Sequence, residues 1–358
     1  GKNYSASQKT GFIEWQTDIS DGLRLYSLIF VPHNYRPEKK YPVKLFLHGG
    51  SQLSNPRAID KMINRQSPEY DSVEYFIMYP SAWAKAEWWF ENQQEHIRKI
   101  LYKLKSLYNI DENHLNITGI SAGGIGAYRT VNSNPTPFSG CITFIGSMED
   151  LNWAKKTKQI YLRNYLNTPF LIINGGQDKT FPPDLVVPYV NALRSAGGDV
   201  RFFMIDTASH NLAWYPLMED KIEPFFQNAI RNPLPDTLCF ETETTDNYNR
   251  LFWLRIDKSG KTKHDSDIDE LNTVIVKGMK APAFNREKQS GIIEVQKSGN
   301  TVKVKTKGIK KYTLLLSPEH FDFDKNIEII TNEQLSFNNK IEKSKETLVK
   351  YAAQDNDR

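Results

Sequence analysis

The sequence predicts an α/β protein in which a mostly parallel sheet, covered by helices on both faces, is followed by an all-β region. Strand-like and helix-like segments alternate over about the first 230 residues, which is the pattern of a parallel sheet with helical connections. After a proline-bounded junction near residues 231–235, no long helical period follows for about 100 residues. The length of 358 residues also favours two domains.

In the first region the strand-like segments are short, rich in β-branched or aromatic residues, and mostly bounded by Pro, Gly, Asn or Asp. They cover residues 23–31, 43–48, 73–79, 115–120, 139–145, 170–174 and 200–205. The clearest helical period lies between them, with apolar residues at steps of three and four from Ile97 to Tyr108. Asn92 and Glu95 resemble a capping box at its start. We assign residues 1–232 to this domain.

The second region contains short alternating segments separated mostly by Gly, Asn or Ser, a pattern typical of an antiparallel sandwich. These segments are residues 250–256, 273–276, 292–296, 301–306, 312–316 and 327–330. We therefore expect a sandwich-like domain over residues 236–333. Residues 334–358, dense in Lys, Asn and Glu, are expected to be a polar tail or a helix on the surface.

Composition and charge exclude several classes of protein. Hydrophobic residues make up 39% of the chain and charged residues 25%, which argues for globular domains and against disorder. The longest apolar run, residues 75–79, is far too short to span a membrane. The net charge of +4, with mixed signs along the chain, gives no footprint for nucleic acid or an anionic membrane. Cys141 and Cys239 lie in apolar runs, and two cysteines cannot build a disulfide framework or a cysteine-type zinc site.

The strongest chemical signal is the segment Gly119-Ile120-Ser121-Ala122-Gly123. It follows a strand-like segment and precedes a helical run, which is the context of a nucleophile elbow: a strand, a sharp turn that carries Ser, and a helix. Glycines two residues before and after Ser121 fit such a turn, because it packs against neighbouring strands without room for a Cβ atom. We predict that Ser121 is a nucleophile.

An acid and a base follow in the order that such a nucleophile requires. Asp178 and His210 each come shortly after a strand-like segment, at the carboxyl edge where sites form in open α/β sheets. We therefore predict a triad of Ser121, Asp178 and His210. Asp206 and Asp184 are the competitors for the acid, and Asp206 ranks lower because it lies only four residues from His210 and must turn back onto it.

An oxyanion-binding loop is expected at residues 45–51, where an apolar strand runs into His48-Gly49-Gly50-Ser51. The donors expected for the oxyanion are the N–H groups of Gly50 or Ser51 and of Ala122, directly after the nucleophile. We interpret His48 as an architectural residue of the loop. The other histidines are scattered without paired spacing, so the sequence implies neither a metal nor an organic cofactor.

Four segments together resemble a known superfamily: the oxyanion motif LHGG, the elbow GISAGG, the acid loop NGGQDKTFPP and the base segment SHNLAW. They are similar to α/β-hydrolases of the esterase and polyhydroxybutyrate-depolymerase type, which are related to feruloyl esterases and to the catalytic domain of prolyl oligopeptidases. The resemblance covers about residues 20–232. It implies an α/β-hydrolase fold and serine-dependent ester hydrolysis, with Ser121, Asp178 and His210 in the catalytic positions. The large N-terminal propeller of prolyl oligopeptidases has no room in this chain, which weakens a peptidase interpretation.

Aromatic residues near these motifs are candidates for binding substrate. Trp83, Trp88 and Trp214 are expected to line the site, where ring faces suit a phenolic acyl group or a sugar ring. The polar insertion at residues 147–168 can form a small rim but not a long apolar lid. In the second domain, lysines alternate with apolar residues over 301–307, which blunts a sheet edge or, less readily, offers a basic face to an acidic polysaccharide.

The sequence thus predicts a serine esterase that cleaves carbohydrate-linked, short-chain or polymeric carboxylic esters through an acyl-enzyme. A peptidase of prolyl-oligopeptidase-like type and a non-catalytic carbohydrate-binding protein are the alternatives. The chain begins Gly1-Lys2-Asn3 without Met, and a lost secretory signal fits that start. We therefore expect a secreted or periplasmic protein whose partner is a small-molecule or polysaccharide ester.

Overall fold

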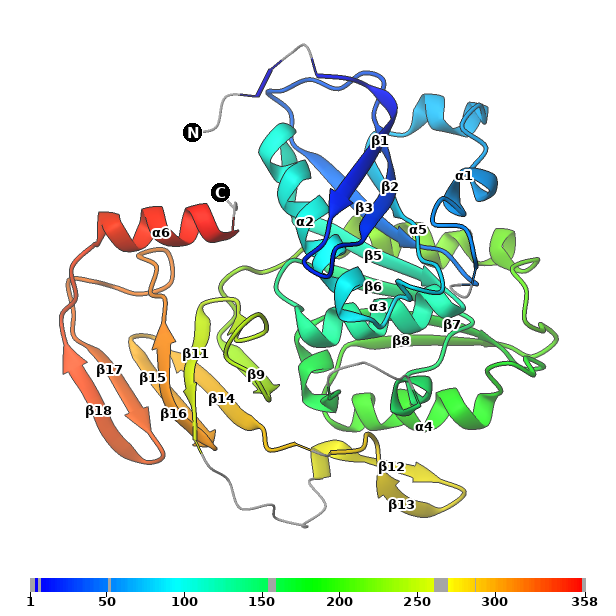
Figure 1. Cartoon of the computed structure of the whole chain (residues 1–358). Helices are drawn as coiled ribbons and strands as arrows, with labels where there is room; N and C mark the ends of the chain where they lie inside the picture. Colours follow the sequence, from blue (N-terminus) through cyan, green and yellow to red (C-terminus); the bar gives the residue numbers. More distant parts are fainter. Residues whose placement is uncertain are drawn as a thin grey trace.

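The computed structural model describes residues 4–5, 8–50, 53–153, 159–260, 270–286 and 288–355. Its largest element is an eight-stranded sheet with helices on both faces, and two smaller sheets lie beside it, on the left in Figure 1. We call the part built around the large sheet the α/β domain and the part built around the smaller sheets the accessory domain.

The large sheet has the strand order of an α/β-hydrolase, which confirms the fold predicted from the sequence. β1 and β2 pair antiparallel, β2 pairs antiparallel with β4, and all later neighbours are parallel. In spatial order the strands are β1 (Gly11–Asp18), β2 (Arg24–Val31), β4 (Phe76–Pro80), β3 (Tyr41–Leu47), β5 (Ile110–Ile120), β6 (Gly140–Phe144), β7 (Phe170–Gly175) and β8 (Val200–Ile205).

Helices cover the two faces because successive side chains of a strand point to opposite sides. The face that carries Cys141 and Ile172 packs against α2, α3 and α4, whereas the neighbouring residues Ile142 and Leu171 pack against α5 on the other face. The helices are α1 (Ile59–Met62), α2 (Glu91–Leu107), α3 (Ala122–Ser133), α4 (Pro183–Ser195) and α5 (Glu219–Asn228). Short 3-10 turns lie at η1 (Pro68–Ser72), η2 (Glu149–Asn152), η3 (Leu162–Asn167) and η4 (Tyr215–Met218).

The accessory domain is built from two sheets around a shared core that includes Phe240, Trp253 and Val295. The first contains β18 (Gln334–Asn339), β17 (Ile327–Thr331), β15 (Thr301–Lys307), β14 (Gly291–Ser298) and β9 (Thr237–Thr242); the second contains β10 (Arg250–Leu251), β11 (Leu254–Ser259) and β16 (Ile309–Leu314). Two sheets around one core match the predicted sandwich-like arrangement. One pairing, between β15 and β17, is parallel instead of antiparallel.

The boundary expected at residue 333 is wrong, because β18 continues the sheet to Asn339 and α6 (Lys345–Asp355) follows. The side chain of Phe337 packs against the accessory core, while most residues of this edge strand are exposed. A strand with so few apolar residues does not show the alternation by which strands are recognised in a sequence.

One hairpin of the second region leaves the accessory sheets and packs on the α/β domain. β12 (Thr273–Val276) and β13 (Met279–Pro282) lie against α4, below it in Figure 1. Val274 and Phe284 belong to the same buried core as the large sheet. The hydroxyl group of Tyr189 on α4 donates to the carbonyl oxygen of Ala283 at 2.7 Å. The two domains are therefore interlocked along the chain rather than joined by a single linker.

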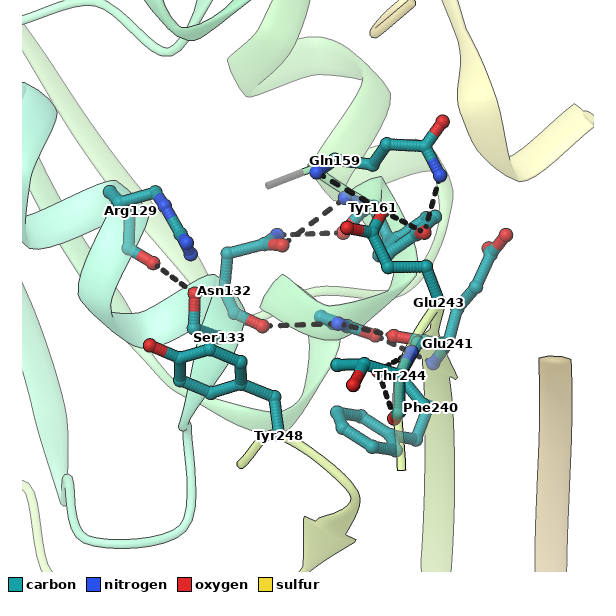
Figure 2. A pocket seen from close by; sticks show the side chains of 12 residues that line it. Arg129, Asn132, Ser133, Gln159, Tyr161, Phe240, Glu241, Glu243, Thr244 and Tyr248 are labelled. Atoms are coloured by element: carbon teal, nitrogen blue, oxygen red, sulfur yellow. Dashed lines mark hydrogen bonds between the residues drawn. The ribbon is translucent and has the colours of Figure 1, made fainter. Parts of the chain in front are cut away.

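The seam between the domains is closely packed where α3 meets β9, with a hollow of about 20 Å³. There Arg129 and Asn132 of α3 face Glu241, Glu243 and Tyr248 of the accessory domain (Figure 2). A space of this size holds about one water molecule. At this point the two domains are thus in direct contact.

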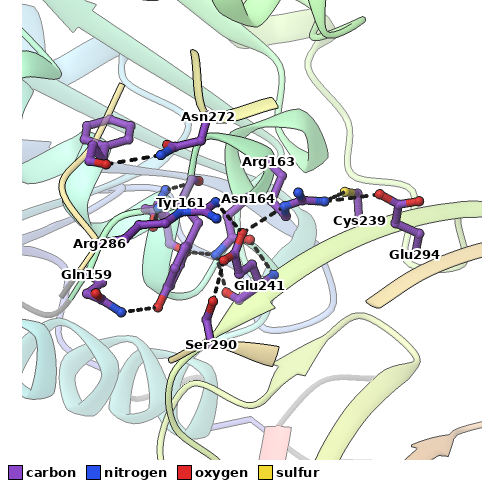
Figure 3. A network of polar contacts seen from close by, with 12 residues as sticks. Gln159, Tyr161, Arg163, Asn164, Cys239, Glu241, Asn272, Arg286, Ser290 and Glu294 are labelled. Atoms are coloured by element: carbon purple, nitrogen blue, oxygen red, sulfur yellow. Dashed lines mark hydrogen bonds and ion pairs between the residues drawn. The ribbon is translucent and has the colours of Figure 1, made fainter. Parts of the chain in front are cut away.

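A buried carboxylate ties the seam together (Figure 3). Glu241 on β9 is fully buried and accepts hydrogen bonds from Arg163 at 2.9 Å, Arg286 at 3.0 Å and the hydroxyl group of Ser290 at 2.5 Å. The side chain of Asn164 pairs with the backbone of Glu241, donating to its carbonyl oxygen and accepting its N–H, both at 2.9 Å. Because Arg163 and Asn164 precede β7, the accessory domain sits at the amino ends of the parallel strands.

Another buried polar contact joins α2 to β2. The Nε2 atom of His96 lies 2.9 Å from the hydroxyl oxygen of Ser27, and both side chains are fully buried. Burial lowers the pKa of His96 to about 3, since the imidazolium would lose its hydration. The folded protein therefore keeps His96 neutral over the whole physiological range.

This histidine predicts a loss of stability in mild acid. As the pH falls below about 6.5, His96 becomes protonated in the unfolded chain, whereas in the folded protein it stays neutral until about pH 3. The free energy of unfolding therefore falls. Between about pH 7.5 and about pH 5 this single group should remove about 2 kcal/mol of the free energy of unfolding. Denaturant titrations should show a flatter pH dependence for His96→Gln. The matched control is His33→Gln, at an exposed position; an equal slope in all three proteins would contradict the prediction.

Candidate active site

Ser121 lies on a sharp turn between β5 and α3. Its backbone has φ 54° and ψ −119°, a conformation that side-chain-bearing residues rarely adopt. The turn is closed by close backbone contacts: a Cβ atom added at Gly119 would lie 2.1 Å from the carbonyl oxygen of Gly123, and one added at Gly123 would lie 2.0 Å from that of Leu47. The N–H of Ser121 donates to the carbonyl oxygen of Phe144 on β6 at 2.9 Å. The expected elbow geometry is thus present.

The structure brings Ser121, His210 and Asp178 into one hydrogen-bonded chain. The Oγ atom of Ser121 lies 3.0 Å from Nε2 of His210, and Nδ1 of His210 donates to Oδ2 of Asp178 at 2.8 Å. Asp178 is buried, and its other oxygen, Oδ1, accepts the N–H groups of Thr180 at 2.8 Å and Phe181 at 2.9 Å. Both oxygens of the carboxylate are therefore held in place.

The competing acids lie elsewhere. Asp206 is exposed, and its backbone packs against Gly176, where an added Cβ atom would lie 2.8 Å from the Cα atom of Asp206. Asp184 is exposed in the first turn of α4. Of these three carboxylates, Asp178 is the one that hydrogen-bonds His210.

Phe181 is a further site residue that the sequence did not single out. Its ring meets the imidazole of His210 edge to face, with centroids 5.4 Å apart, and its N–H binds Asp178. One residue thus fixes the orientation of both the acid and the base. The only sequence signal was its position three residues after Asp178.

The loop after β3 is held by His48. The Nδ1–H group of this histidine donates to the carbonyl oxygen of Gly49 at 2.8 Å, and its Nε2 atom accepts the N–H of Ala82 at 3.0 Å. These two bonds define the neutral tautomer, and burial lowers the pKa of His48 accordingly. The indole N–H of Trp88 donates to the carbonyl oxygen of His48 at 2.9 Å. The interpretation of His48 as an architectural residue agrees with these contacts.

The residues expected to bind an oxyanion are placed as follows. Ala122 opens α3, so its N–H has no partner within the helix. Gly50 is exposed and has φ 67°, and Ser51 lies outside the described residues. Gly49 lies next to the nucleophile, since a Cβ atom added there would lie 3.4 Å from Cβ of Ser121. The described part of the loop therefore lies beside the turn that carries Ser121.

The structure contradicts two of the three tryptophans expected to line the site. Trp88 is fully buried against Gly126 of α3, and Trp214 is 4% exposed and meets Phe144 edge to face at 5.6 Å. Both belong to the core beneath the site because their large apolar rings pack against it on every side. Trp83 is half-buried beside the β1–β2 turn, and its role in binding stays a prediction.

An exposed aromatic residue lies on the loop after β6. Trp153 is 75% exposed, and its indole N–H donates to Oε1 of Glu149 at 2.7 Å. β6 ends next to the nucleophile, since a Cβ atom added at Gly146 would lie 3.2 Å from the carbonyl oxygen of Ser121. The residue before it, Asn152, donates to the hydroxyl oxygen of Tyr189 at 3.1 Å and to the carbonyl oxygen of Ala283 at 2.9 Å, so this part of the insertion packs against α4 and the β12–β13 hairpin. A rim formed by residues 147–168 stays a prediction.

The described residues contain no group of three or more His, Cys, Asp or Glu side chains arranged to hold a metal ion. Within the same part of the chain, no helix is both long enough and apolar enough to cross a membrane. The free thiols of Cys141 and Cys239 lie apart, the first fully buried and the second half-buried beside Arg163.

No protein-family model matches the sequence. Among solved structures, the chain is similar to a thermostable esterase, with 25% identity and a TM-score of 0.49 over 60% of this chain and 62% of that chain. It is also similar to the acylaminoacyl peptidase of Pyrococcus horikoshii (16% identity, TM-score 0.49, 63% of this chain and 43% of that chain). A third similar structure is Thermogutta terrifontis esterase 2 phosphorylated by paraoxon (15% identity, TM-score 0.49, 62% of this chain and 96% of that chain). The chain thus spans about three fifths of the first of these proteins and less than half of the second. The activity of this chain is therefore put forward below as a proposal.

The contacts of the Ser121 turn predict that Gly123→Ala is strongly destabilising. The new Cβ atom would overlap the backbone of Leu47, and overpacking of this kind costs about 1–3 kcal/mol or more. Gly124→Ala is the matched control on the same helix, because its nearest neighbour, the Cα atom of Gly146, lies at 3.3 Å. Thermal unfolding should show a much larger fall in Tm for Gly123→Ala; equal shifts for the two variants would mean that the turn is not closely packed.

Proposed function

We propose that this protein is a serine hydrolase that cleaves carboxylic esters through an acyl-enzyme. The observation that carries the proposal is the hydrogen-bonded chain from Ser121 through His210 to Asp178, located at the carboxyl edge of the parallel strands. A nucleophile, a base that can take its proton and an acid that orients the base are the three parts needed for acyl transfer.

In the proposed mechanism, the Oγ atom of Ser121 attacks the ester carbonyl carbon while Nε2 of His210 takes its proton. Asp178 keeps the imidazole in the required tautomer and stabilises the imidazolium that forms. The N–H groups of Ala122 and of Gly50 or Ser51 stabilise the negative charge on the tetrahedral oxygen. His210 then returns the proton to the leaving alcohol. In the second half of the cycle it activates the water molecule that releases the acid.

The substrate class proposed is a carbohydrate-linked, short-chain or polymeric ester. Ser121 and His210 are half-buried rather than enclosed, which suits a site that accepts part of a large molecule. Such polymers are met outside the cytoplasm, so a secreted or periplasmic location belongs to this proposal.

Assays of esters against amides separate the proposed esterase from a peptidase. The rate of product release should be compared between esters and aminoacyl p-nitroanilides. The esters are p-nitrophenyl acetate, feruloylated sugars, acetylated xylan and short hydroxyalkanoate oligomers. Turnover of an anilide above that of every ester would identify the chain as a peptidase.

Replacement of the nucleophile should abolish turnover. Ser121→Ala removes the attacking oxygen, and loss of a triad nucleophile lowers kcat by on the order of a million-fold. Ser209→Ala, next to His210, is the control and should keep activity within about twofold, because surface substitutions of this kind have small effects. The measurement is hydrolysis of p-nitrophenyl acetate, with labelling by a serine-directed phosphonate as a second readout. If Ser121→Ala folds and retains a tenth of the activity, Ser121 is not the nucleophile.

The identity of the acid can be tested with two matched variants. Asp178→Asn keeps the size of the side chain but presents the wrong hydrogen-bonding pattern to Nδ1 of His210, for which a loss of about 10,000-fold is the known precedent. Asp206→Asn, at an exposed position, should stay within about tenfold of the unaltered enzyme. The reverse outcome in kcat would assign the acid to Asp206.

A further inference from the structure

The loop that carries Asp178, residues 175–181, is closed by a side chain that the proposed mechanism does not use. The side-chain amide of Asn174, near the end of β7, donates from Nδ2 to the carbonyl oxygen of Phe181 at 2.9 Å and to that of Gly175 at 3.1 Å. These two acceptors are the last and the first residue of the loop. A single amide group therefore bridges both ends of the Asp178 loop.

The surroundings of Asn174 show what its polar side chain is for. The residue is fully buried, and within the described part of the chain its Oδ1 atom has no hydrogen-bond partner. Both neighbours of Nδ2 are carbonyl oxygens, which accept hydrogen bonds and cannot donate them, so the orientation of the amide is fixed by chemistry. A buried acceptor without a partner costs free energy, and β7 already pairs through its backbone with β6 and β8. The contact that accounts for an amide at this position is the closure of the loop.

This closure reaches the acid and the base through Phe181. The N–H of Phe181 donates to Oδ1 of Asp178 at 2.9 Å, and Asn174 holds its carbonyl oxygen, so the peptide groups on both sides of Phe181 are fixed. The ring of Phe181 meets the imidazole of His210 with centroids 5.4 Å apart. A displacement of Phe181 would therefore disturb Asp178 and His210 together.

The Asp178 loop is also tied to the segment that carries the base. The N–H of Gln177 donates to the carbonyl oxygen of Ala208 at 2.9 Å. A Cβ atom added at Gly175 would lie 2.4 Å from the same oxygen, so the two segments are in direct backbone contact. Because Ala208 lies two residues before His210, the position of the Asp178 loop affects the position of the imidazole.

We propose that Asn174 is a positioning residue, which holds Asp178 and His210 in the geometry needed to take the proton of Ser121. Because Asn174 is fully buried, it acts through these residues and not by contact with a substrate. Positioning matters to the rate, since a misplacement of about 1 Å can lower it by about 100-fold. The inference rests on the proposed function as a serine hydrolase, so its test includes a measurement that needs no turnover.

Kinetics of Asn174→Ala and Asn174→Ser test the proposal. A methyl group cannot donate, and the serine hydroxyl has one hydrogen and cannot bridge both carbonyl oxygens. We expect kcat for p-nitrophenyl acetate to fall about tenfold or more, while KM changes by less than about threefold. In an Asp178→Asn background the same substitutions should lower kcat by less than about twofold further, because residues that act as a unit are not additive.

Asn116→Ala is the matched control. Asn116 is also a fully buried asparagine of the large sheet, and its amide donates to the hydroxyl oxygen of Ser139 at 2.9 Å beside Gly140, at the amino end of β6. Its loss should lower Tm but keep kcat within about twofold. The proposal would be overturned by an equal loss of kcat from Asn116→Ala, by an undiminished loss in the Asp178→Asn background, or by unchanged kcat in both Asn174 variants.

Proton NMR with isotope-labelled histidine tests the positioning without turnover. The proton on Nδ1 of His210, held in the 2.8 Å hydrogen bond to Asp178, is expected to give a downfield resonance. Asn174→Ala and Asn174→Ser should shift or broaden this resonance, whereas Asn116→Ala should leave it in place. An unchanged resonance in the Asn174 variants would overturn the proposal. If the unaltered protein cleaves no ester or amide and does not react with a serine-directed phosphonate, the proposed function fails, and the resonance still decides whether Asn174 positions Asp178 and His210.

Discussion

The backbone turn at Ser121 is the constraint on which the rest of the site depends. A residue with a side chain is strained at φ 54°. The close packing around the turn holds Ser121 in this conformation. Gly119 and Gly123 let the start of α3 contact the end of β5 and the carbonyl of Leu47 without any side chain between them. The hydrogen bond from Ser121 to Phe144 ties the turn to β6 as well. Three neighbouring strands thus converge on the one residue whose side chain reaches His210.

A second constraint acts on the loop beside the turn. The carbonyl groups of His48 and Gly49 are both engaged, the first by Trp88 and the second by the imidazole of His48 itself. Because these carbonyls are held, the peptide planes that follow them are restricted in orientation. The imidazole must be neutral to accept the N–H of Ala82, and burial favours the neutral form. Trp88 therefore positions the loop by its hydrogen bond to His48 and, being fully buried, does not contact a substrate.

The sequence allowed the prediction of features whose cause is local. The elbow at Ser121 is encoded by two glycines within five residues, and Asp178 and His210 follow their strands directly, so their meeting at one edge follows from the parallel order of the strands. The features that were predicted wrongly from the sequence depend on residues far away in the chain. Trp88 is buried because Gly126, 38 positions later, leaves a space that its ring fills, and β18 is a strand because β17 provides an edge for it. Neither partner can be recognised from the residues of the segment itself.

The buried carboxylate of Glu241 ties the accessory domain to the α/β domain. Glu241 is fully buried, and a carboxylate removed from water is tolerated only when charged and polar partners surround it. Arg163 comes from the α/β domain, while Arg286 follows the hairpin that packs on α4, so separation of the two domains would leave these charges without compensation. The seam is therefore expected to hold until the whole chain unfolds. Because it is anchored at the amino ends of the parallel strands, this domain lies away from the carboxyl edge that carries Ser121.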